Sequence, residues 1–179
     1  MEYLNLYDKN GNLLKEKGIR GEKSDNLVGI VIIFVQNSNG EFLIQKTSKN
    51  RNSIYATTGG HVSYGDDFIE TVIKEMKEEL NIDINKNEIQ EINTYIRDYY
   101  IQKVYYTKKD IDIKNIKVQK SEVDFVEWLS IEKIKELIKN NCFREGNIEA
   151  FNYIITNICK WNKEFFINTD ILKELDKTN

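Results

Sequence analysis

The sequence predicts an α/β fold with a mixed sheet, on three observations. An Asn-Gly pair at 10–11 separates the strand-like runs 2–7 and 12–16, which is a strong β-hairpin signal. Residues 27–35 are short, apolar and β-branched, which is typical of a buried strand. Residues 68–80 instead carry apolar side chains in i, i+4 rows, which predicts a helix packed on a core.

The remaining elements follow from the same patterns. A polar turn at 36–40 leads into an alternating strand, and a polar loop at 48–53 follows that strand. Further strands are expected at 41–46, 88–97, 99–107 and 123–129, a turn at 110–115, and helices at 131–138 and 148–161. Ser130 is the expected N-cap of the first of these helices.

Composition places the chain among ordinary globular proteins. Its 179 residues suffice for one domain with a core, and no repeat or linker divides them. A net charge of −3 argues against binding of a nucleic-acid polymer, which would require a basic face. The N-terminus lacks a signal-peptide pattern and the apolar runs are too short for a bilayer, so a cytoplasmic protein without a membrane partner is expected. Cys142 and Cys159 are then expected to be free thiols, buried or half-buried.

Three acids dominate the predicted helix at 68–80. Glu75, Glu78 and Glu79 fall at i, i+3 and i+4, so they share one side of the helix. Carboxylates held together repel one another unless a cation lies between them, and Mg²⁺ is a hard cation that prefers oxygen ligands. Taken alone, the three acids fit an ordinary solvated helix face better, because neighbouring lysines can pair with them.

The segment before the helix favours a functional site. The glycine pair at 59–60 allows the backbone to approach a ligand closely. Asp67, with Glu70 three residues later, resembles a capping box at the start of the helix. A glycine loop, a capped helix and an acid cluster therefore follow one another directly.

In this order, residues 60–82 resemble the Nudix box, whose pattern is G-x5-E-x7-R-E-U-x-E-E-x-G-U, with U a bulky apolar residue. The register is kept without an insertion. Six positions match: the first glycine is Gly60, the glutamates are Glu75, Glu78 and Glu79, and the apolar positions are Met76 and Ile82.

Three positions depart from the strict pattern: Asp66 stands for Glu, Lys74 for Arg and Asn81 for Gly. Asp keeps the carboxylate, and Asn tolerates the left-handed conformation that ends helices. Lys keeps the charge but cannot make the planar two-point contact of Arg, so the orientation of Glu75 is expected to be looser.

The resemblance implies the α/β/α sandwich of Nudix domains with a mixed sheet, in one domain spanning 1–179. It is strongest over residues 25–140, including the strand at 123–129 and the glutamate-containing helix after it. Residues 1–25 resemble the N-terminal hairpin of the branch related to isopentenyl diphosphate isomerase. Residues 140–179 would form a C-terminal helical extension.

The family resemblance also implies a hydrolase that cleaves the diphosphate linkage of a nucleoside diphosphate joined to another moiety. Mg²⁺, or Mn²⁺ in its place, would neutralise phosphate oxygens and lower the pKa of a bound water. Its implied ligands are Glu75, Glu78 and Glu79 together with the Gly60 carbonyl. Lys74 would orient Glu75 or offset the charge of the cluster, which is compatible with a plain surface pair with Glu78.

The general base in the family is either a box glutamate, here Glu78, or an acid on a later loop. Glu122, directly before the strand at 123–129, is the candidate on that loop. An acid in this position is equally expected simply to be exposed to solvent. Asp98 is the second loop candidate.

Candidate substrate-binding residues are His61, Tyr64 and Arg51. His61, the single histidine, would hydrogen-bond a substrate phosphate or serve as a structural histidine under the loop. An aromatic side chain such as Tyr64 more often packs against its neighbours than stacks on a base. The expected partner is a small-molecule diphosphate, and a homodimer would match many relatives.

Two alternatives remain. A non-catalytic Nudix fold that senses nucleotides would not require a metal, and the departures at 66, 74 and 81 are compatible with it. The related isomerase is similar to this stretch but has a catalytic cysteine directly before Gly-His, where this chain has Gly59. The three intact glutamates favour the hydrolase.

Overall fold

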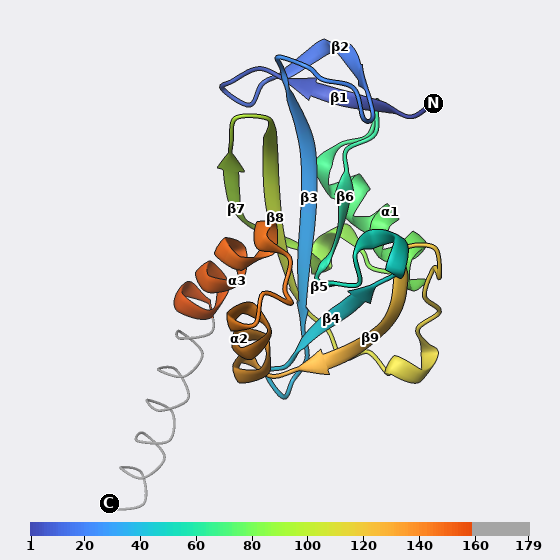
Figure 1. The fold of residues 1–179 in the computed structure, drawn as a ribbon, viewed down its shortest axis with the longest axis vertical. Helices are drawn as coiled ribbons and strands as arrows, with labels where there is room; N and C mark the ends of the chain where they lie inside the picture. Colours follow the sequence, from blue (N-terminus) through green and yellow to red (C-terminus); the bar gives the residue numbers. More distant parts are fainter. Residues whose placement is uncertain (159–179) are drawn as a thin grey trace, which may run out of the picture. The chain divides into compact units, whose positions relative to one another are not determined.

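The computed structural model describes residues 1–158, which belong to two compact units. The first unit is Met1–Arg144, and it holds the sheet and helices α1 (Phe68–Leu80) and α2 (Ile131–Lys139). The second begins at Glu145 and, as far as it is described, contains helix α3 (Glu145–Asn157). Figure 1 shows these elements along the chain.

The first unit is built on a mixed sheet. Short 3-10 helices occur at η1 (Lys49–Arg51), η2 (Lys86–Glu88) and η3 (Ile113–Asn115). The strands are β1 (Tyr3–Tyr7), β2 (Leu13–Ile19), β3 (Leu27–Gln36), β4 (Phe42–Thr47), β5 (Tyr55–Ala56), β6 (Thr58–His61), β7 (Gln90–Ile96), β8 (Tyr100–Lys108) and β9 (Val123–Leu129).

Strand β3 is the centre of the sheet. It pairs in parallel with β8 and antiparallel with β1, β4 and β6. β4 in turn pairs with β5 and β9, and β8 pairs with β7. A central strand that is covered on both faces is apolar along its whole length, which explains the continuous apolar run at 27–35.

The predicted N-terminal hairpin is confirmed. β1 and β2 pair antiparallel, with Tyr3 opposite Ile19. Gly11 takes a positive φ of 85° in the turn, and the Asp8 carboxylate accepts hydrogen bonds from the backbone N–H groups of Asn10 and Asn12. Asn-Gly thus ends the first strand as its turn chemistry requires.

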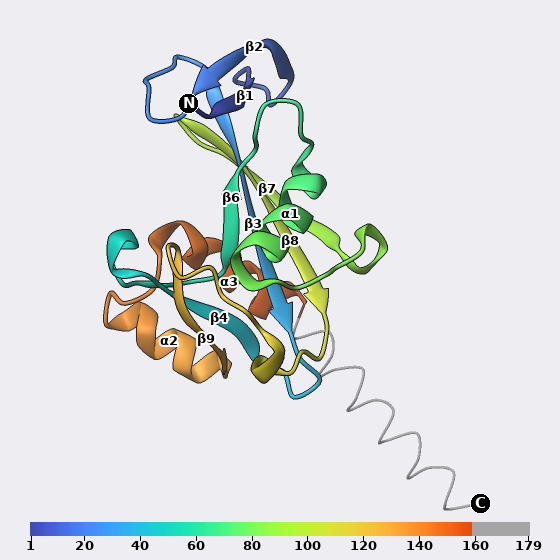
Figure 2. The ribbon, with the colours of Figure 1, turned by 90° about the vertical axis from the view of Figure 1, so that its right-hand side faces the viewer.

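Helix α1 packs on β3 and β6, and Figure 2 shows α1 and α2 on opposite sides of β3. Its predicted apolar rows do enter the core, because Val72, Met76 and Leu80 are almost completely buried. The predicted capping box is present: Asp67 Oδ1 accepts from the Glu70 N–H at 2.7 Å, and the Asp67 N–H donates to Glu70 Oε2 at 2.9 Å. Asn81 ends the helix in the left-handed conformation, as predicted.

Two expectations need correction. The segment 58–61, expected as a glycine loop, is strand β6, because Thr58 to His61 pair with Ile33 to Ile30 of β3. Cys142 was expected to be buried or half-buried, yet it is exposed, since it lies in the turn that follows α2. Cys159 and the predicted end of the last helix at Trp161 lie outside the described residues.

The other predicted elements agree closely with the structure. Ser130 caps α2, with its Oγ accepting from the Lys133 N–H at 3.2 Å. α3 starts at Glu145, three residues before its predicted start at 148. None of the helices within residues 1–158 combines the length and apolar character that a membrane span requires.

Candidate functional site

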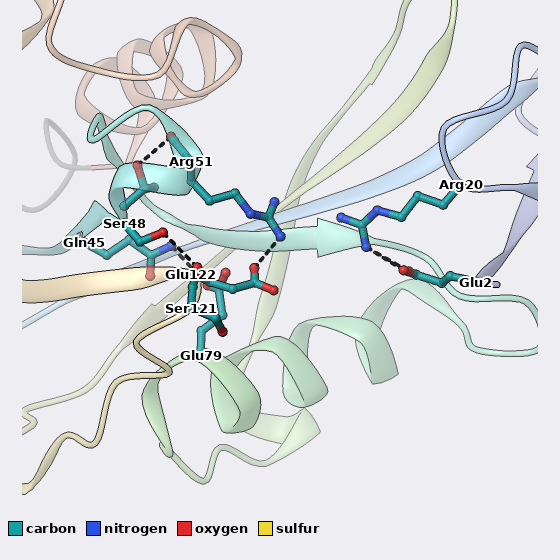
Figure 3. A network of polar contacts seen from close by, with 9 residues as sticks. Glu2, Arg20, Gln45, Ser48, Arg51, Glu79, Ser121 and Glu122 are labelled. Atoms are coloured by element: carbon teal, nitrogen blue, oxygen red, sulfur yellow. Dashed lines mark hydrogen bonds and ion pairs between the residues drawn. The ribbon is translucent and has the colours of Figure 1, made fainter.

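The site is centred on two glutamates of α1 that face the sheet. Glu75 and Glu79 are one helical turn apart, so the helix presents both to the same surface. Glu79 is only 5% exposed, and its Oε2 accepts a hydrogen bond from Gln45 Nε2 of β4 at 3.1 Å. Figure 3 shows Gln45 reaching Glu79 from the sheet. A buried carboxylate is therefore held between the helix and the sheet.

Gly60 of β6 makes room for the second glutamate. A Cβ at this position would overlap with the carboxyl group of Glu75, which lies directly against the strand. At Gly59 an added Cβ would instead meet the Val31 carbonyl oxygen of β3. The glycine pair is thus required by the close packing of α1, β6 and β3, and Gly60 brings backbone next to the Glu75 carboxylate.

Burial and mutual repulsion make both carboxyl groups weak acids. Burial raises the pKa of Glu79 to about 8, and the nearby Glu75 and Glu122 add to the rise against the hydrogen bond from Gln45. Burial also raises the pKa of Glu75 to about 7, with further contributions from Glu78 and Glu122. At neutral pH the pair therefore retains protons unless a positive charge replaces them.

Glu78 and Lys74 lie further out. Glu78 is exposed and lines a surface cavity of about 400 Å³ on the outer side of α1, together with Glu70, Ile73, Lys74, Lys77, Ile82, Asp83 and Ile84. Lys74 Nζ contacts Asp66 Oδ2 at 3.5 Å, with both side chains partly exposed. The three box glutamates therefore share a helix side only loosely: two face inward and Glu78 faces solvent.

The predicted loop acid lies beside the predicted substrate arginine. Arg51 Nη2 and Glu122 Oε2 form an ion pair at 2.8 Å. The backbone holds them together, because the Ser48 N–H donates to the Glu122 carbonyl at 2.8 Å and Ser48 Oγ donates to the Ser121 carbonyl at 2.8 Å. Figure 3 shows this pair above Glu79. Glu122 and Arg51 thus join the site from two separate loops.

The remaining predicted residues, His61, Tyr64 and Asp98, lie in three different environments. His61, half-buried at the end of β6, has a pKa lowered by burial and by the charges of Arg20 and Arg51, so its ring is mostly neutral at pH 7. Tyr64 is 51% exposed, with Lys17 Nζ at 5.9 Å from its ring centre. Asp98 lies in the connection between β7 and β8.

Three further residues reach the site that sequence reasoning did not select. Gln45 comes from the buried face of β4, and Arg20 from the residue after β2. The pKa of Arg144 is lowered by burial and by Arg51 and raised by Glu79, and its side chain makes no ion pair with the described residues. No local pattern marks these residues, because each is brought to the site by pairing between distant segments.

The oxygen atoms at the centre of the site are of the kind that bind a divalent cation. One buried and one partly buried carboxylate, both with raised pKa values and beside a strand backbone at Gly60, are oxygen donors that a hard cation would neutralise. Within residues 1–158, no three His, Cys, Asp or Glu side chains stand together in an arrangement that could hold a metal ion. Glu75 and Glu79 fit such an ion, and a third side-chain ligand would have to move.

Comparison with known proteins places this geometry in a family. Residues 26–150 match the NUDIX domain, which is more than half of the chain. The chain belongs to the Nudix family. This confirms the predicted family and its enzyme class, Nudix hydrolase.

Relatives agree with this assignment. An uncharacterised Nudix hydrolase of Listeria innocua is 27% identical over 143 residues, covering 76% of this chain and 85% of that protein. An uncharacterised Nudix hydrolase of Listeria monocytogenes is 25% identical over 143 residues, again covering 76% of this chain and 85% of that protein.

Solved structures agree on the fold. DR0079 of Deinococcus radiodurans superposes with a TM-score of 0.72 at 20% identity, covering 84% of this chain and 98% of its own. The Nudix domain of NrtR from Shewanella oneidensis, crystallised with ADP-ribose, gives a TM-score of 0.52 at 13% identity, covering 66% and 81%. These similarities confirm the predicted α/β Nudix fold.

Proposed function

We propose that this Nudix hydrolase cleaves the diphosphate linkage of a nucleoside diphosphate joined to another moiety, with Mg²⁺ or Mn²⁺ bound by the box glutamates. The observation that carries the proposal is the inward-facing pair of carboxylates against Gly60, in which Glu79 is buried and Glu75 is partly buried. Such a pair is costly unless it is protonated or bound to a cation. A costly feature of this kind is typical of a functional site.

In this proposal Glu75 and Glu79 would hold the cation, together with the Gly60 carbonyl, and Glu78 would contribute to the site directly or through water. When bound, the cation would neutralise phosphate oxygens and lower the pKa of a water molecule. Lys74 contributes charge at the edge of the cluster and contacts Asp66, where it offsets the acids.

The reaction is the attack of water on one phosphorus. A P–O bond to the water oxygen forms, the bridging P–O bond breaks, and the bridging oxygen leaves on the second phosphate. The proton of the water passes to a general base, and we assign that role to Glu122, with the box glutamate Glu78 as the alternative. Glu122 is favoured by its position beside Glu75 and Glu79, on both of which its charge acts.

Arg51 is the proposed phosphate-binding residue. Its guanidinium is paired with Glu122 through Nη2, while Nε and Nη1 donate to no described residue. A guanidinium binds phosphate oxygens in a planar, two-point geometry. A phosphate that bound Arg51 would compete for it with Glu122, and so would free the proposed base.

His61 and Tyr64 have smaller roles in this proposal. A mostly neutral His61 ring can donate a hydrogen bond to a phosphate oxygen without adding charge. Tyr64 offers an exposed ring to the part of the substrate outside the diphosphate.

A panel of diphosphate compounds, with and without Mg²⁺, tests the proposal, with ADP-ribose first because the related NrtR domain was crystallised with it. We expect metal-dependent release of two phosphate-bearing products by the wild type and none by Glu79→Gln. Turnover that persists without metal, or in Glu79→Gln, would contradict the proposed mechanism.

The alternative function is a Nudix fold that binds nucleotides without cleaving them. It is favoured by one observation: no three potential ligand side chains in the described part of the chain are arranged to hold a metal ion. Calorimetric binding of ADP-ribose with no turnover at any Mg²⁺ concentration would support this alternative.

A further inference from the structure

The N-terminal hairpin, which precedes the residues that match the family, brings a guanidinium to the site. Arg20 directly follows β2, and its backbone N–H donates to the Glu2 carbonyl at 3.0 Å. Its side chain is 39% exposed. The Nudix match begins only at residue 26, so the family pattern says nothing about this arginine.

The hairpin is fixed to the segment that directly follows β6. The Asn5 N–H of β1 donates to the Val62 carbonyl at 3.1 Å, and the Tyr64 N–H donates to the Tyr3 carbonyl at 2.9 Å. The Asn5 side chain adds two bonds to the next turn, donating to the Asp66 carbonyl at 2.8 Å and accepting from the Gly65 N–H at 3.1 Å. Arg20 is therefore held in register with β6 and the start of α1.

Arg20 and Arg51 reach the same place from opposite sides. Figure 3 shows their side chains pointing toward one another along β6, above α1. Each is anchored by one carboxylate on its own side, Glu2 for Arg20 and Glu122 for Arg51, both at 2.8 Å. Like charges that point toward one another are unfavourable unless an anion lies between them.

Both arginines keep donors available for such an anion. Arg20 contacts both Glu2 oxygens through Nη1 alone, at 2.9 and 2.8 Å. Its Nε and Nη2 donate to no residue within 1–158, as is also true of Nε and Nη1 of Arg51. The charge of Arg20 also acts at the acid pair, where it lowers the pKa of Glu75 and of the adjacent His61.

We infer that Arg20 is a substrate-binding residue: its guanidinium binds oxygens of one phosphate of the diphosphate, opposite Arg51, which binds the other. The N-terminal hairpin is thereby a wall of the site. This inference rests on the proposed diphosphate substrate, but it concerns binding and does not require cleavage.

The test measures binding of imidodiphosphate, a diphosphate that resists hydrolysis, by calorimetry in the presence of Mg²⁺. The proteins are the wild type, Arg20→Gln, Arg20→Lys and Arg97→Gln. Arg97 is the matched control, because it lies in the turn between β7 and β8, where its guanidinium donates to the Ile96 carbonyl at 3.4 Å. Thermal unfolding of each variant checks that the fold is kept.

Arg20→Gln is expected to weaken binding about ten-fold or more, since a hydrogen bond to a charged group is lost. Arg20→Lys should restore part of the affinity, because it keeps the charge but not the two-point geometry. Arg97→Gln should bind within about two-fold of the wild type, as a surface change outside the site. For a compound that is turned over, Arg20→Gln should raise KM more than it lowers kcat.

Two results would overturn the inference. Wild-type affinity in Arg20→Gln would show that the hairpin does not take part in binding, while the hydrolase proposal would stand. Failure of the wild type to bind imidodiphosphate would show that there is no diphosphate site between Arg20 and Arg51. Binding that depends on Arg20 without turnover of any compound would instead uphold this inference and refute hydrolysis.

Discussion

Glu78 and Glu79 are neighbours in sequence and identical in chemistry, but they occupy opposite environments. Glu79 is 5% exposed, accepts a hydrogen bond from Gln45 and has its pKa raised to about 8 by burial. Glu78 is exposed and lines a cavity on the outer side of α1. One step along a helix turns a side chain by about 100°, which is enough to separate core from solvent. Acids that are clustered in the sequence therefore need not be clustered in space.

The largest expected effect separates these two glutamates. Glu79→Gln should reduce the kcat of metal-dependent hydrolysis by about 10²–10⁴-fold, the range for a group that acts in the chemical step. Glu78→Gln, the neighbouring change on the same helix, should cost about ten-fold or less, because Glu122 is the assigned base and the Glu78 carboxylate lies outside the inward-facing pair. Steady-state kinetics on the best substrate of the panel measures both. A larger loss in Glu78→Gln would instead assign the role of general base to Glu78.

The next effect probes the contact between Gly60 and Glu75. Gly60→Ala places a Cβ where the Glu75 carboxyl group lies, so Glu75 must move. We expect a loss of activity of about 10–100-fold, as for disturbed metal-site geometry. Overpacking should lower the free energy of unfolding by about 1–3 kcal/mol.

Gly146→Ala is the control for that change, since a Cβ there meets nothing within 4 Å. Denaturant unfolding and hydrolysis assays on both variants give the comparison. Full activity in Gly60→Ala would mean that Glu75 does not need its position against β6.

A third prediction concerns the pH dependence of stability without divalent cations. The pKa of Glu79 is raised from its ordinary 4.5 to about 8, so its protonated form stabilises the fold fully below about pH 4.5. This contribution is lost as the pH rises from about 4.5 to about 8, because the folded protein must then bury a charge. Glu75 and Glu122 favour the protonated form of this group, whereas Gln45 and Arg51 favour its charged form. Arg144, whose own pKa is raised by Glu79, also favours the charged form.

Urea unfolding at pH 5 and pH 8 measures the effect. The wild type should be less stable at pH 8, and Glu79→Gln, which cannot ionise, should lose less stability over the same range. Added Mg²⁺ should restore more stability at pH 8 than at pH 5, since it replaces the protons. Equal stability of the wild type at both pH values, with no effect of Mg²⁺, would contradict the claim that ionisation of the buried Glu79 destabilises the fold.

The smallest effect is expected at Lys74. Its contact with Asp66 is 3.5 Å long and partly exposed, and such surface pairs contribute about 0–1 kcal/mol. Lys74→Gln should therefore change the free energy of unfolding by about 1 kcal/mol or less, and kcat by only a few-fold. An effect as large as that of Glu79→Gln would indicate that Lys74 orients Glu75 directly.

Much of the fold could be predicted because its signals are local. The Asn-Gly turn, the Asp67 capping box, the Asn81 helix end and the Ser130 cap each depend on residues within a few positions of one another. β6 was missed for the opposite reason. Thr58–His61 has little strand character of its own and becomes a strand by pairing with β3.

The family, the box register and the helix that carries the glutamates can all be predicted from consecutive residues, because a helical period and its caps are local features. Only the tertiary structure decided which glutamates are buried, why Gly60 must lack a side chain, and that Arg20, Gln45 and Arg51 converge on them. The physical reason is that burial and electrostatic proximity come from pairing between strands far apart in the chain. No spacing within one segment encodes that pairing.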